Sequence, residues 1–83
     1  MPYIEEAKKL IGETLQIQDR VDSFKADTLL LGHVPELDSM AVVSIITTME
    51  EHFGFIVEDD EISADTFESI GSLAEFINQK LSA

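Results

Sequence analysis

The chain has 83 residues, no cysteine, and 17 acidic against five basic residues, which gives a formal net charge of −12. This length suits one small domain, expected over residues 1–83, and the lack of cysteine excludes a disulfide framework and a thiolate metal site. The negative charge argues against nucleic acid and anionic membrane as partners, because like charges repel, and it favours partners with basic patches or divalent cations.

The hydropathy of the chain excludes two further classes of protein. Hydrophobic residues make up 45% of the sequence, which is too many for a disordered acidic chain. No apolar run approaches about 18 residues, so we expect no insertion into a membrane. Residues 1–6 contain no basic stretch followed by an apolar one, so we expect no signal peptide and a cytoplasmic location.

The first predicted helix spans about residues 3–16. Pro2 suits a first helical turn, where a missing N–H costs nothing, and Glu5 and Glu6 suit the positive end of the helix dipole. The apolar stripe of this helix consists of Ile4, Ala7, Ile11 and Leu15. Residues 17–37 show no regular period, so we expect a long first loop that lies across the helices. Its expected anchors are Phe24, Leu29 and Leu31.

The second predicted helix, 39–53, has the clearest boundaries. Asp38 is a good N-cap, and Gly54 suits the position after the last turn, where the backbone turns left-handed. The run 55–57 is apolar but has no strand partner elsewhere in the sequence, so we expect a loop packed on the core. A short helix is predicted at about 60–65. The last helix, about 70–81, follows Ser69 as N-cap.

These elements predict an all-α protein. We expect a small four-helix bundle, with three main helices, one short helix and a long first loop. Its net charge is uneven, −4 over residues 1–41 and −8 over residues 42–83. The second half is therefore the expected docking surface for a basic partner.

Two kinds of site are disfavoured by the residues present. His33 and His52 are far apart in the sequence, and no hydrolase or nucleotide-binding motif is present, so we expect no enzymatic activity. A small hydrolase that uses Ser39 with His33 is the weakest alternative. The acidic run 58–61 lacks the ligand spacing and the glycine of an EF-hand loop, so we expect no metal site there.

Ser39 is the candidate functional residue. Its hydroxyl lies at the expected start of a helix, where free N–H groups favour a phosphate ester. The loop before it contains Gly32 and Pro35, so we expect an exposed position, with apolar Met40 within one turn. An aspartate and a serine at a helix start are more often only a cap.

The wider sequence resembles the acyl carrier protein family. Leu37-Asp38-Ser39-Met40 is similar to the attachment motif of that family, and the resemblance extends through three later segments to cover nearly the whole chain. These segments are Glu50-Glu51 with Phe53-Gly54, Asp59-Asp60-Glu61-Ile62, and Ile70, Leu73 and Ile77.

The resemblance implies a cofactor and partners. Ser39 would receive 4′-phosphopantetheine from coenzyme A, delivered by a separate phosphopantetheinyl transferase that uses Mg²⁺, and Asp38 would help to position that enzyme. Acyl-loading and acyl-transferring enzymes would dock through basic or apolar patches, with the carrier a monomer. The implied docking residues are Met40, Ala41, Val42, Ser44, Glu50 and Glu51. Those of an acyl cleft are Ile45, Ile46, Met49, Phe53, Ile62 and Ile77, for each of which core packing is an equal alternative.

The sequence departs from fatty-acid carriers at the start of the second helix. That family usually has acidic residues there, whereas this chain has Ala41, Val42 and Ser44. The departure favours a dedicated pathway over bulk fatty-acid synthesis, and residues 35–43 are similar to bacterial carriers of exosortase and exopolysaccharide systems. A polyketide pathway, an aminoacyl carrier of the D-alanyl type, and an acidic adaptor or Ca²⁺-binding module are the alternatives.

Overall fold

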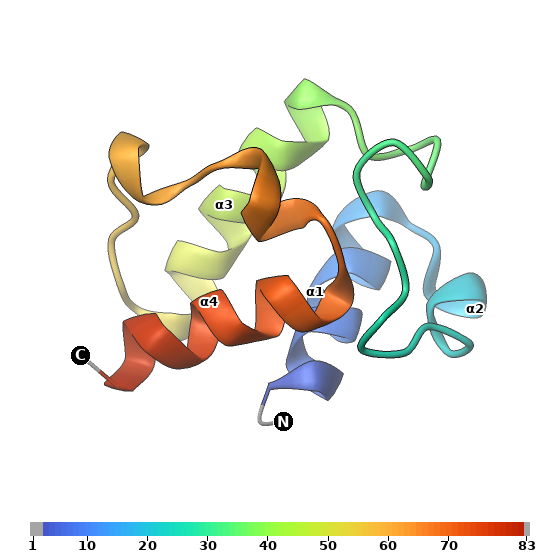
Figure 1. The fold of residues 1–83 in the computed structure, drawn as a ribbon, viewed down its shortest axis with the longest axis horizontal. Helices are drawn as coiled ribbons and strands as arrows, with labels where there is room; N and C mark the ends of the chain where they lie inside the picture. Colours follow the sequence, from blue (N-terminus) through green and yellow to red (C-terminus); the bar gives the residue numbers. More distant parts are fainter. Residues whose placement is uncertain (1–2, 83) are drawn as a thin grey trace.

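The computed structural model describes residues 3–82, apart from the side chain of Asp59. Over this range the chain is all-α (Figure 1), as predicted, with four α-helices, two 3-10 turns and no strand. The elements are α1 (Ile4–Leu15), α2 (Gln18–Val21), α3 (Ser39–Phe53), η1 (Asp59–Glu61), η2 (Ala64–Phe67) and α4 (Ile70–Ser82). None of the helices in this range is long and apolar enough to cross a membrane.

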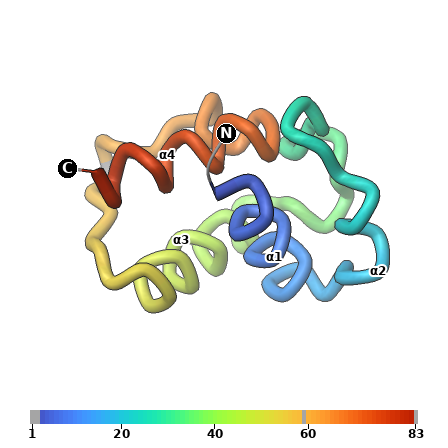
Figure 2. Tube along the Cα trace, turned by 90° about the horizontal axis from the view of Figure 1, so that it is seen from below, coloured from blue at the N-terminus to red at the C-terminus, as the bar shows by residue number. Residues whose placement is uncertain are grey.

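Helix α1 is the centre of the packing. It contacts α2, α3 and α4, and Figure 2 shows it lying between α3 and α4. Its helical spacing places Ala7, Leu10 and Ile11 on one buried face. The largest fully buried side chains come from α1, the first loop, α3, η2 and α4, and they are Ile11, Leu30, Ile45, Met49, Phe67, Ile70, Leu73 and Ile77.

The predicted caps of the later helices are confirmed. The Asp38 carboxylate accepts a hydrogen bond of 2.8 Å from the Ala41 N–H. Gly54 has a φ of 76°, and its N–H donates to the Glu50 carbonyl at 2.8 Å. Before α4, the Ser69 hydroxyl accepts the Ser72 N–H at 3.1 Å. The ends of α3 and the start of α4 are therefore set by local side-chain and backbone chemistry.

The long first loop contains a helix that the sequence did not predict. Helix α2 has four residues, which is too short to show a helical period. It is held because Val21 is buried against α1, where Gly12 leaves room for its side chain. The loop is therefore partly structured.

The predicted anchors of this loop are wrong in part. Phe24 is half-buried, but Leu29 and Leu31 are 45% and 39% exposed, and Leu30 between them is fully buried. The physical reason is a short extended pairing, in which the Leu30 N–H donates to the Glu68 carbonyl at 2.8 Å. Side chains alternate in extended backbone, so burying Leu30 turns both neighbours outward.

Gly71 provides a test of the contact between this loop and α4. A Cβ at Gly71 would lie 2.8 Å from the Ala26 carbonyl oxygen, whereas a Cβ at Gly12 would meet only a methyl group of Val21, at 2.9 Å. Backbone cannot move aside as a side chain can. Gly71→Ala should therefore lower the free energy of unfolding by about 1–3 kcal/mol.

Urea unfolding of both alanine variants measures this difference. Gly12→Ala should cost less, because Val21 can shift and alanine gains about 1 kcal/mol of helix propensity over glycine. Equal stability of Gly71→Ala and the wild type would contradict the close approach.

Candidate functional site

Ser39 is exposed at the first residue of α3. The chain leading to it is held by two buried side chains, Val34 and Leu37, which are 7% and 5% exposed. Backbone hydrogen bonds join the Val34 N–H to the Leu30 carbonyl at 2.8 Å and the Leu37 N–H to the Val34 carbonyl at 3.0 Å. The serine hydroxyl is thus presented to solvent from a fixed backbone.

The N-terminus of α3 has free hydrogen-bond donors. The Asp38 carboxylate accepts a hydrogen bond from the Ala41 N–H at 2.8 Å. The Asp38 carbonyl accepts one from the Val42 N–H at 3.0 Å. The N–H groups of Ser39 and Met40 have no acceptor among the described residues. Free donors together with the helix dipole favour a phosphate group bound close to the Ser39 hydroxyl.

The exposed side of α3 begins with an apolar pair. Met40 is 74% exposed and Val43 is 58% exposed, and the first turn contains no acidic residue. Ser44 is exposed as well, whereas Ala41 and Val42 are half-buried. Val43 was missing from the predicted docking residues. Its position four residues after Ser39, on the same side of the helix, was the signal that could have identified it.

The two glutamates near the end of α3 differ in their surroundings. Glu51 is exposed, whereas Glu50 is half-buried, and its carboxylate accepts a hydrogen bond of 2.8 Å from the Val57 N–H. Glu50 therefore holds the chain that follows α3, while Glu51 faces solvent.

The six predicted cleft residues lie in two layers. Ile45, Met49 and Ile77 are fully buried, and three half-buried residues, Ile46, Phe53 and Ile62, pack against the core around them. The rings of Phe53 and Phe55 stack nearly parallel with their centres 5.8 Å apart. All six residues thus belong to the hydrophobic core or pack against it, three of them fully buried and three half-buried.

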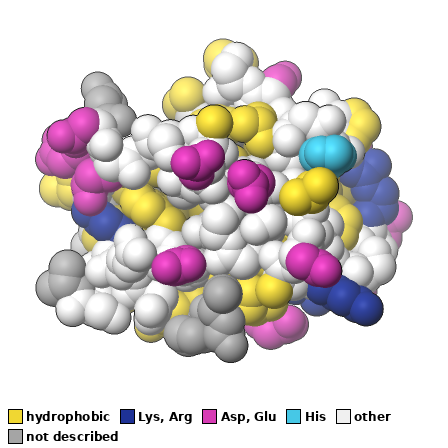
Figure 3. Space-filling model, in the orientation of Figure 1, with side chains coloured by type: hydrophobic (Ala, Val, Ile, Leu, Met, Phe, Trp, Pro, Cys, Tyr) yellow, Lys and Arg dark blue, Asp and Glu magenta, His cyan; other side chains and the backbone are white. Residues whose placement is uncertain are grey.

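Few basic side chains are visible on the face of the molecule that Figure 3 shows. Figure 3 shows acidic side chains spread over one face of the molecule and Lys and Arg only near its edges. The Arg20 guanidinium donates a hydrogen bond to Glu36 and holds the pKa of that carboxyl below its ordinary value. The Lys80 ammonium does the same for the pKa of Glu61, helped by the Glu58 N–H.

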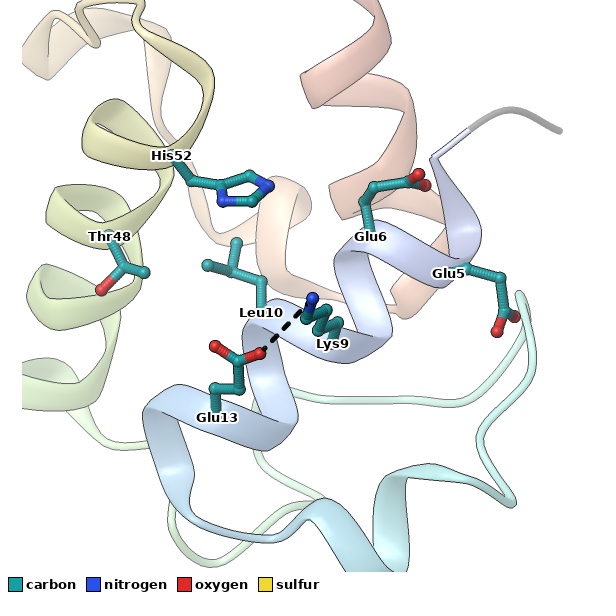
Figure 4. A pocket seen from close by; sticks show the side chains of 7 residues that line it. All are labelled: Glu5, Glu6, Lys9, Leu10, Glu13, Thr48 and His52. Carbon is teal, nitrogen blue, oxygen red and sulfur yellow. Dashed lines mark ion pairs between the residues drawn. The ribbon is translucent and has the colours of Figure 1, made fainter.

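A hollow of about 270 Å³ lies between α1 and α3 (Figure 4), away from Ser39. Thr48 lines one wall, and at about 100° per residue it points to the opposite side of α3 from Ser39, nine residues earlier. His52 lines the same wall, and Figure 4 shows Leu10 of α1 between the two walls. The hollow is therefore not the site at Ser39.

The alternatives to a carrier find little support in the geometry. Among the described residues, no group of three His, Cys, Asp or Glu side chains could hold a metal ion. His33 is exposed in the first loop, and within residues 3–82 no hydrogen bond joins it to the Ser39 hydroxyl. A Ca²⁺-binding module and a Ser39–His33 hydrolase therefore gain no argument from the structure.

Two comparisons with known proteins agree with each other. The family model described as "Phosphopantetheine attachment site" matches residues 6–77. Among solved structures, a holo acyl carrier protein from Nitrosomonas europaea, determined by solution NMR, is 51% identical, with a TM-score of 0.93 and 100% of each chain covered. A search of curated proteins finds no match.

The lowered pKa of Glu61 predicts how stability depends on pH. A carboxyl whose pKa is lower in the folded state stabilises the fold above its unfolded pKa of about 4.3, and this contribution is lost as the pH falls through the folded pKa. Glu61→Gln should therefore lower the melting temperature at pH 7, and the difference should shrink as the pH falls through the folded pKa.

Melting curves of wild type and variant between pH 7 and pH 3 measure this effect. Glu13→Gln is the matched control, because Glu13 pairs with Lys9 at 3.9 Å in an exposed position, where an ion pair contributes little. A difference between wild type and Glu61→Gln that grows as the pH falls would contradict the sign of the shift.

Proposed function

The chain belongs to the phosphopantetheine attachment-site family and is an acyl carrier protein, and we propose that Ser39 is the residue to which its 4′-phosphopantetheine is attached. The protein is a carrier and not an enzyme. When bound, the prosthetic group supplies a thiol that holds an acyl group as a thioester. This membership confirms the resemblance seen in Leu37-Asp38-Ser39-Met40 and in the later helices.

The observation that carries the assignment is the exposed hydroxyl of Ser39 at a capped helix start. The group to be attached contains a phosphate, and the free N–H groups of Ser39 and Met40 lie where its charge would be stabilised. The family interacts with a phosphopantetheinyl transferase and with acyl-handling enzymes. Since Asp38 is exposed and uses one carboxylate oxygen for the cap, we propose that the other oxygen helps to position the transferase and its Mg²⁺.

Modification of Ser39 is tested by intact mass. Incubation with coenzyme A, Mg²⁺ and a broad-specificity transferase should add one phosphopantetheine to the wild type and none to Ser39→Ala. Ser23→Ala is the matched control, because Ser23 is an exposed serine in the first loop, outside the proposed docking surface, and should be dispensable. An adduct on Ser39→Ala, or none on the wild type, would refute the assignment.

We propose that partner enzymes dock mainly through apolar contacts at the start of α3 and less through attraction between charges. The support is the exposure of Met40 and Val43 beside Ser39 and the lack of an acidic residue in the first turn. Ala41, Val42 and Ser44 border this pair, and Glu51 adds charge at the far end of the helix. A partner that meets Ser39 must also cover these apolar side chains, so its own surface there should be apolar.

Val43→Ala measures this contribution. It removes about 1–2 kcal/mol of apolar burial in the docked complex, so the KM for the transferase should rise by about five- to thirtyfold, with kcat unchanged. Thr47→Ala, exposed one turn further along the helix, is the control and should leave KM unchanged. A KM that is insensitive to Val43→Ala but rises steeply with salt would indicate docking by charge instead.

The cargo and the pathway are also proposals. Ile46, Phe53 and Ile62, here called the rim, are half-buried and pack against the core that contains Ile45, Met49 and Ile77. We propose that an acyl chain is sheltered in a cleft between the rim and this core. The uncharged start of α3 supports a dedicated lipid, polyketide or exopolysaccharide pathway in a bacterial cytoplasm. We propose that the carrier acts there as a monomer.

A further inference from the structure

Residues 54–62, here called the cover segment, lead from the end of α3 towards η2 and α4. Figures 1 and 2 show the segment running along the end of the molecule where α3 and α4 both finish. Two of its side chains, Phe55 and Ile62, are half-buried and pack against the core. Ile62 belongs to the rim of the proposed cargo cleft, so the position of the cover segment affects access to that cleft.

The first half of the cover segment is attached to α3. The Gly54 N–H donates to the Glu50 carbonyl at 2.8 Å, and the Val57 N–H donates to the Glu50 carboxylate at the same distance. The stacking of Phe55 on Phe53 adds an aromatic contact between segment and helix. Up to Val57, these hydrogen bonds and the ring stacking join the segment to α3.

The second half is attached to α4 through one lysine. The Lys80 ammonium donates to both carboxylate oxygens of Glu61, each at 2.8 Å, and the Glu58 N–H donates to the same carboxylate at 2.9 Å. The ammonium also lies 5.8 Å from the centre of the Phe55 ring, within reach of a cation–π interaction. Lys80 thus contacts the cover segment at both ends, once at Phe55 and once at Glu61.

This ion pair differs from an ordinary surface pair. The Lys80 side chain is 19% exposed and that of Glu61 33% exposed, whereas Lys9 and Glu13 are 71% and 55% exposed at a distance of 3.9 Å. Lys80 is the only Lys or Arg between residues 26 and 83 of the sequence, so this half of the chain has no other cation to replace it. Partial burial and contact with both oxygens make the pair stronger than its exposed counterpart.

We propose that Lys80 and Glu61 are positioning residues that fasten the cover segment over the cargo cleft, so that breaking this ion pair loosens the segment and gives access to the cargo. The role of the segment in covering cargo rests on the proposed carrier function. The fastening of the segment by the Lys80–Glu61 ion pair does not depend on that function. A docked enzyme could release the segment by offering Glu61 a cation or Lys80 an anion of its own.

Hydrogen exchange of the unmodified protein tests the fastening. In Lys80→Met, which keeps the aliphatic side chain but removes the charge, amides of residues 55–62 should exchange several-fold faster, while those of α1 stay unchanged. Lys80→Arg should restore slow exchange, and Lys9→Met is the matched control for loss of one surface charge. Unchanged exchange in 55–62, or a uniform increase over the whole chain, would overturn the proposal.

A loaded carrier tests the consequence for the cargo. Hydroxylamine should cleave an octanoyl thioester faster on Lys80→Met than on wild type or Lys9→Met, whereas an acetyl thioester, too short to enter the cleft, should be cleaved at the same rate on all three. Faster amide exchange with unchanged octanoyl cleavage would overturn the role of the segment in covering cargo. Failure of all variants to accept the prosthetic group would instead refute the proposed function and leave the exchange result standing.

Discussion

The structure depends on how a loop of about 20 residues is pinned before α3. Burial of Leu30 and its backbone pairing with the chain before α4 fix the loop at its middle, and Val34 and Leu37 fix its end. Ordering so many residues costs conformational entropy, which these buried contacts offset. Because the loop is anchored, Ser39 is exposed to solvent yet held on a fixed backbone. The proposed attachment of a prosthetic group by another enzyme requires such a position.

The three long helices were readable from the sequence, as were the caps Asp38, Gly54 and Ser69, because these residues act on neighbouring backbone. The short helix predicted at about 60–65 is instead two 3-10 turns, η1 and η2. The errors arose where distant segments decide the outcome. The burial of Leu30 in place of Leu29 and Leu31 depends on pairing with residues 67–69, which no local pattern shows. The half-buried state of Glu50 likewise depends on the chain after α3, where the Val57 N–H donates to the Glu50 carboxylate. Ser39 could be proposed as the attachment residue because the exposed helix start is a local feature and the surrounding sequence resembles a known attachment motif.

Most of the basic residues form ion pairs with acidic residues of the same molecule. Four of the five basic residues pair with acidic side chains within residues 3–82, and two of these pairs, Arg20–Glu36 and Lys80–Glu61, join segments far apart in the sequence. These four basic residues thus form ion pairs within the molecule, and the other described acidic side chains, apart from Glu50, face solvent. Any cation that meets this surface has to come from a partner.

The inward hydrogen bond of Glu50 has a consequence for mutational mapping of carrier surfaces. An alanine scan reports the cost of truncation, which includes rearrangement of the free protein. Truncating Glu50 leaves the Val57 N–H without its acceptor and shifts the chain beside it, so a binding assay would score Glu50 as an interface hot spot even for a partner that never touches it. Interface maps of such small bundles need a structural readout for each variant before a residue is assigned to the contact surface.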